Sequence, residues 1–104
     1  MREFHHVGIQ TNIKRENEKY VTDGKVYITD FDAHPYNIEW LRFEDDSPMP
    51  EEIQKIPHVA FKVDDLEAEL EGKNVLMEPF VPMEGVRVAF ILEDGAPIEF
   101  MQFD

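Results

Sequence analysis

The chain has 104 residues with 42% apolar content, which is enough for one globular domain with a modest core. It carries 23 Asp or Glu against 10 Lys or Arg, and this formal net charge of −13 argues against binding to nucleic acid or an anionic membrane. It has no cysteine, no basic and apolar leader and no apolar run of membrane-spanning length, so we expect a cytoplasmic protein without disulfides or thiolate ligands.

The first half of the chain is predicted to contain three strands. Alternating apolar positions and branched or aromatic side chains indicate strands at residues 3–11, 25–31 and 36–43. Residues 12–23 are polar and charged and lack an apolar stripe, so we expect a loop there. Residues 32–35 contain a proline and are expected to form a turn.

The middle of the chain is predicted to connect two halves. Residues 45–56 are rich in proline and acidic side chains, as is typical of a linker. Pro50 is suited to the start of a helix, so we expect one or two helical turns over residues 51–55.

The second half opens with a predicted strand and the only clear helix. Val59 and its alternate neighbours indicate a strand over residues 58–63. Asp64 or Asp65 is suited to cap the helix that follows, and Gly72 is suited to end it.

Three further strands are predicted to complete the chain. The first covers residues 74–78, and we expect Pro79 and Pro82 to break the chain after it. Strands at 86–92 and 97–103 are separated by an Asp-Gly pair, which is typical of a hairpin turn.

The strands of the two halves repeat each other. Residues 6–11 read HVGIQT and residues 58–63 read HVAFKV, while residues 37–44 read NIEWLRFE and residues 97–104 read PIEFMQFD. The second copy is longer because it contains the helix. The predicted organisation is a single domain made of module 1 at 1–44, a linker at 45–56 and module 2 at 57–104.

Each repeat places one histidine and one glutamate where they need a partner. Strand alternation puts His6 and His58 on the face opposite the apolar one, each followed on that face by a small residue that leaves room for a ligand. Glu39 and Glu99 lie on otherwise apolar strand faces, where a carboxylate is costly unless it is paired, exposed or bound to a cation. Two imidazoles and two carboxylates suit a divalent Zn, Ni, Mn, Co or Fe ion.

These segments resemble a known family. Residues 58–66 followed by 94–100 resemble a module of the vicinal oxygen chelate superfamily, and residues 6–9 resemble the opening strand of its first module. The superfamily includes glyoxalase I, extradiol dioxygenases, methylmalonyl-CoA epimerase, and fosfomycin- and bleomycin-resistance proteins. The resemblance implies an α+β fold in which two βαβββ modules, here with the first helix truncated, form a cup-shaped sheet around a divalent metal.

The resemblance also implies roles for the four repeated side chains. His6, His58 and Glu99 match the metal ligands of the family, and Glu39 matches an additional carboxylate that serves as a ligand or a general base. The alternative for Glu39 is a surface acid paired with a basic residue, either Arg42 or Lys25.

Other polar residues are candidates for contact with a substrate. His5 adjoins a candidate ligand but has the opposite parity, so we expect it to face the core or the sheet edge. Arg87 is expected to point toward the cleft and bind an anionic group, although a salt bridge to a nearby acid is the alternative. The candidate substrate contacts are Gln10, Tyr27, Lys62 and Arg87.

The leading functional hypothesis is a small metal-dependent enzyme similar to glyoxalase-type lyases and isomerases. It would act on a small molecule with two adjacent oxygens; with three protein ligands on iron, dioxygenase-type chemistry is also open. The alternative is a metal-free protein that sequesters a small molecule, as in the bleomycin-resistance branch. We expect a homodimer, with the site formed either within one chain or between two chains.

Overall fold

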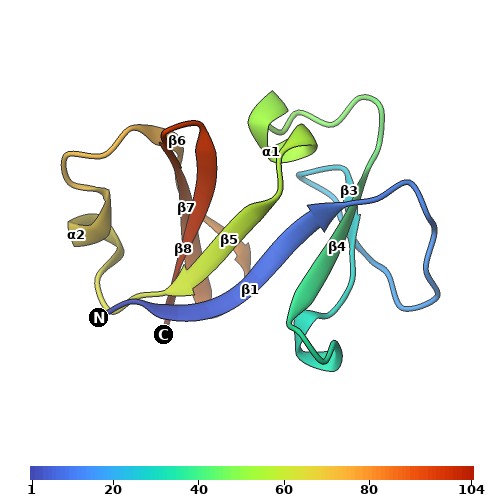
Figure 1. The fold of residues 1–104 in the computed structure, drawn as a ribbon, viewed down its shortest axis with the longest axis horizontal. Helices are drawn as coiled ribbons and strands as arrows, with labels where there is room; N and C mark the ends of the chain where they lie inside the picture. The colour runs from blue at the N-terminus through green and yellow to red at the C-terminus, as the bar shows by residue number, and fades with distance from the viewer.

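A computed structural model describes all 104 residues of the protein. One eight-stranded sheet in the order β2-β3-β4-β1-β5-β8-β7-β6 forms most of it, and two short helices lie against the sheet (Figure 1). The fold class is therefore confirmed as α+β with a cup-shaped sheet. The elements are β1 (Glu3–Gln10), β2 (Lys19–Val21), β3 (Val26–Ile28), the 3-10 helix η1 (Phe31–Ala33), β4 (Ile38–Phe43), α1 (Glu51–Lys55), β5 (His58–Lys62), α2 (Leu66–Leu70), β6 (Val75–Met83), β7 (Val86–Glu93) and β8 (Ala96–Phe103).

The two halves of the chain have the same strand order and meet at the centre of the sheet. Strand β1 pairs with β4 in parallel, β5 pairs with β8 in parallel, and β1 and β5 join the halves as an antiparallel pair. Val7 lies opposite Val59, while His6 lies opposite Ala60 and Gly8 opposite His58. Each histidine therefore faces a small residue of the other half, so neither ring collides with a bulky neighbour.

The parallel pairs place the two glutamates symmetrically beside this centre. Gly8 is the register partner of Glu39, and Ala60 is the register partner of Glu99. Since Gly8 and Ala60 occupy equivalent positions in the repeated strands, the fold brings both glutamates toward the same point as the histidines.

The outer face of the second half is covered by α2. Leu66 of this helix is fully buried against strands β7 and β8, in a cluster with Ala89 and Phe100. The expected N-cap is confirmed for Asp65, whose carboxylate accepts a hydrogen bond from the Ala68 backbone N–H at 3.2 Å. Neither helix is both long and apolar enough to cross a lipid bilayer.

Two expectations about the strands were wrong. Residues 12–23 were expected to form a loop, but they contain β2, which pairs with β3. Pro79 and Pro82 do not end a strand, because β6 continues through both of them. Strand β6 lies at the edge of the sheet and pairs with β7 through repeated register shifts, and both conditions let a strand accommodate proline.

Candidate metal centre

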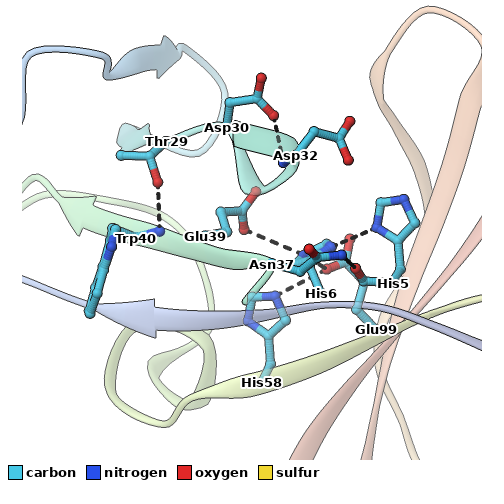
Figure 2. A network of polar contacts seen from close by, with 10 residues as sticks. All are labelled: His5, His6, Thr29, Asp30, Asp32, Asn37, Glu39, Trp40, His58 and Glu99. Carbon is cyan, nitrogen blue, oxygen red and sulfur yellow. Dashed lines mark hydrogen bonds and ion pairs between the residues drawn. The ribbon is translucent and has the colours of Figure 1, made fainter. Parts of the chain in front are cut away.

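Three buried side chains from three strands converge at the centre of the sheet. His6 comes from β1, Glu39 from β4 and His58 from β5, and one ligand atom from each lies within 4.8 Å of the others (Figure 2). Their exposed fractions are 1%, 9% and 3%. Ordinary packing does not place this many polar groups together in a core, and the three are close enough for one metal ion to bridge them.

Glu99 of β8 joins the same cluster. Its Oε1 lies 3.1 Å from His58 Nε2 and 3.4 Å from His6 Nε2, and Glu39 Oε1 lies 3.6 Å from His6 Nε2. All four side chains predicted from the repeated pattern thus come together within one chain. The alternative pairing of Glu39 with a surface base is absent, since Arg42 pairs with Glu18 and Lys25 pairs with Asp46.

Three of the four imidazole nitrogens of this cluster lack hydrogen bonds. His6 Nε2 and both ring nitrogens of His58 are buried without a hydrogen-bond partner, even though carboxylate oxygens lie close by. Buried polar atoms are nearly always paired, so these three need an explanation. Imidazole lone pairs and carboxylates form a donor set suited to a divalent transition metal, and the residues present therefore fit such an ion.

The two carboxylates of the cluster differ in acidity. Burial raises the pKa of Glu39 to about 7. Burial acts on Glu99 in the same direction, but its contacts with His58 and His6 outweigh burial and lower its pKa to about 2. Contact with Glu99 likewise outweighs burial at His6 and raises the pKa of that imidazole. The cluster therefore combines a firmly ionised carboxylate with one that exchanges a proton near neutral pH.

His5 lies beside His6, and the expectation of opposite parity was wrong. The register of β1 shifts between Phe4 and His6, so a bulge interrupts the alternation of side chains. His5 Nδ1 lies 2.8 Å from His6 Nδ1 in hydrogen-bond contact. If the proton of this bond belongs to His6 Nδ1, His6 Nε2 is left with a free lone pair, as a metal ligand requires.

We expect His5→Phe to weaken metal binding by about 10-fold without abolishing it, because a lost orienting partner typically costs 10- to 100-fold in affinity. A ¹⁵N NMR spectrum of the imidazoles should also show His6 no longer fixed as one tautomer. His5→Asn can still accept the His6 proton and should restore much of both properties. Equal affinity in the wild type and His5→Phe would rule out this orienting role.

Gly8 makes room for the His58 ring. A Cβ at position 8 would lie 2.2 Å from His58 Cε1 and 2.7 Å from its Nε2. The space beside His6, predicted to admit a ligand, is therefore occupied by the ring of His58 from the other half. The mirror position, Ala60, carries a Cβ and is fully buried.

We expect Gly8→Ala to displace the His58 ring, to lower metal affinity at least 10-fold and to cost about 1–3 kcal/mol of stability through overpacking. Ala60→Gly is the matched control in the other half. It should cost up to about 1 kcal/mol through backbone entropy and leave metal affinity nearly unchanged. Metal titration and urea denaturation measure both effects, and unimpaired metal binding by Gly8→Ala would contradict the packing argument.

Two aromatic rings hold the histidines in place. The Phe31 ring is stacked on His6 with centroids 4.5 Å apart and planes 8° apart, and Phe90 contacts His58 edge-on at 5.3 Å. Residue 31 was expected to end a strand, but it begins η1, where Asp30 caps the turn by accepting a hydrogen bond from Asp32 N–H. An Asp just before Phe31 is the sequence signal that could have indicated this turn.

A cavity of about 310 Å³ opens beside the cluster and is lined by Glu39, His58 and Glu99 together with apolar side chains. The four predicted substrate contacts do not line it, and their role stays a prediction. Arg87 does not point toward the cleft: it pairs with Glu67 of α2, on the outer face of the sheet, because strand alternation turns its neighbours Val86 and Val88 inward. The other three are engaged elsewhere: Gln10 donates to the Ile53 and Ile56 carbonyls, Tyr27 contacts Tyr20 and Arg42, and Lys62 lies over Phe103.

The curled sheet and its paired halves have the cup-shaped fold of glyoxalase and bleomycin-resistance proteins. Among solved structures, a hypothetical protein, BH1468 from Bacillus halodurans C-125, is similar with a TM-score of 0.70 and 19% identity, covering 99% of this chain and 95% of that one. Methylmalonyl-CoA epimerase from Mycobacterium tuberculosis is similar with a TM-score of 0.67 and 18% identity, covering 98% and 88%. No family model and no curated protein sequence matches the chain.

Proposed function

We propose that the protein is a small metal-dependent enzyme of the vicinal oxygen chelate superfamily that moves a proton on a carbon next to a carbonyl. The observation that carries this proposal is the buried cluster of two imidazoles and two carboxylates, with unpaired ring nitrogens, at the wall of a cavity. The residues that would hold the ion are His6, His58, Glu99 and, in the resting state, Glu39.

The chemistry divides between the ion and the protein. A bound divalent ion would polarise a substrate oxygen as a Lewis acid. Glu39 is the proposed base: its carboxylate lines the cavity beside the two histidines, where it would take a proton from carbon and return it.

The similarity to an epimerase supports proton transfer, although a shared fold does not by itself define a reaction. The second candidate function is metal-free sequestration of a small molecule, as in bleomycin-resistance proteins. The apolar cavity of about 310 Å³ favours this alternative, because it could hold a ligand without any ion.

Hydrogen–deuterium exchange tests the proposed reaction without knowledge of the natural substrate. The probe is 2-hydroxyacetophenone (C₆H₅–CO–CH₂OH), which has oxygens on adjacent carbons. The protons of its CH₂ group, between the ketone carbonyl and the hydroxyl group, are the ones expected to exchange. We expect loss of its CH₂ signal in D₂O, followed by ¹H NMR, with protein loaded separately with Zn, Ni, Mn, Co or Fe(II). Exchange should be lost in the metal-free protein and in Glu39→Gln.

Two results would count against the enzyme. If the folded protein binds none of the five metals, yet binds the probe, the sequestering function is supported instead. If metal-loaded wild type and Glu39→Gln exchange the probe at the same rate, Glu39 is not the base.

A further inference from the structure

The walls of the cavity come from both halves of the protein and are mainly apolar. Of its 18 lining residues, 11 are hydrophobic, so any ligand body that fills the cavity contacts carbon on most sides. These hydrophobic residues include Val26, Leu41, Phe80, Val88 and Phe90.

These apolar residues lie deep in the protein. Val26, Leu41, Val88 and Phe90 are all buried, and they come from β3, β4 and β7 on opposite sides of the central strands. Phe80 of the edge strand β6 packs against the buried cluster that contains Val88. The ligand body would therefore be largely withdrawn from water. A charge buried there without a partner would be costly.

The charged residues at the cavity all have the same sign. Asp23 at the exposed rim and the two glutamates of the cluster line it, and no lysine or arginine does. Basic residues on or next to the strands that form its walls are engaged elsewhere: Lys25 pairs with Asp46, Arg42 with Glu18 and Arg87 with Glu67, while Lys19 lines a separate surface pocket. Away from the metal centre, a carboxylate or phosphate in the ligand body would meet apolar carbon and Asp23, with no basic side chain to pair with it.

We infer that the substrate is an uncharged molecule with an apolar body, which fills the cavity and presents two adjacent oxygens to the cluster. This inference rests on the proposed function, because the oxygens are assigned to the candidate metal centre. It sets the protein apart from an enzyme for anionic thioesters or phosphorylated sugars, whose charged groups require basic partners.

A matched pair of ligands tests the inference. Isothermal titration calorimetry measures the affinity of 2-hydroxyacetophenone and of its 4-carboxylate derivative, which share the same adjacent oxygens, for the metal-free and the metal-loaded protein. We expect the neutral compound to bind at least 10-fold more tightly than the carboxylate in both states. Equal affinities, or tighter binding of the carboxylate, would overturn the inference.

A pair of lysine variants links this preference to the cavity. Val81 lines the cavity and is 63% exposed, so Val81→Lys adds a positive charge at the rim without disturbing the core. Ile13 is 64% exposed and does not line this cavity, so Ile13→Lys adds the same charge elsewhere. We expect Val81→Lys, but not Ile13→Lys, to reduce the affinity ratio of the neutral compound to the carboxylate by about 5-fold. Equal effects of both variants would show that overall charge sets the preference.

The outcomes for the substrate class and for the enzyme can be told apart. Metal binding and exchange with no preference for the neutral ligand would refute the substrate class and leave the enzyme standing. If the protein prefers the uncharged ligand but binds no metal, the proposed enzymatic function is refuted. The preference would then apply to a ligand that the protein sequesters.

Discussion

Replacing Glu39 with glutamine is expected to stabilise the metal-free protein at pH 8 while abolishing metal-dependent proton transfer. Burial raises the pKa of Glu39 to about 7 from an ordinary value of 4.5. The folded protein therefore binds a proton at Glu39 more tightly than the unfolded chain does. The stability that this proton contributes is fully present below pH 4.5 and is lost as the pH rises through about 7. By this linkage, glutamine, which does not ionise, should gain about 3 kcal/mol over the wild type at pH 8.

Urea denaturation at pH 4.5 and pH 8 measures this difference directly. The stability gain of Glu39→Gln should appear at pH 8 and shrink toward pH 4.5. Glu84→Gln is the control, because Glu84 is exposed in the turn between β6 and β7 and should show no such dependence. The claim behind this prediction is that the Glu39 carboxylate serves function and lowers stability. A Glu39→Gln protein that is less stable than the wild type at pH 8 would contradict it.

Removing either histidine is expected to abolish the stabilisation that metal gives to the folded protein. An ion that binds only the folded state at 1,000 times its Kd stabilises it by about 4 kcal/mol. His6→Ala and His58→Ala each remove a buried nitrogen with no hydrogen-bond partner, so we expect each to lose nearly all of this gain. Thermal unfolding with and without the ion measures the change in Tm.

The matched control for this series is His34→Ala. His34 lies at the end of η1, outside the cluster, and its ring accepts a hydrogen bond from the Tyr36 backbone N–H. This variant should keep the full metal-dependent rise in Tm. An equal loss in all three variants would point to nonspecific binding by histidines or surface acids.

The centre of the fold and of the site could be predicted because both depend on strand alternation. A strand has only two faces, so the repeated His-Val and Ile-Glu pairs fix which side chains share a face. Duplication then places equivalent residues around an approximate two-fold axis. His6, His58, Glu39 and Glu99 come together in the structure for this reason.

What could not be predicted depends on contacts between distant segments. The bulge that turns His5 toward His6 arises from pairing with β5, which the local sequence does not encode. The proline-containing strand β6 forms because it lies at the edge of the sheet, a position that follows only from the complete topology. The orientation of Arg87 likewise depends on α2, because this helix places Glu67 where it pairs with the guanidinium on the outer face of the sheet.

The most direct test of the account is anomalous diffraction from crystals grown with manganese or zinc. We predict one strong anomalous peak per chain, bound at about 2.0–2.3 Å by His6 Nε2, His58 Nε2 and one oxygen each of Glu39 and Glu99. A folded protein whose cluster holds no ion at saturating metal, while peaks occur only among surface acids, would contradict it.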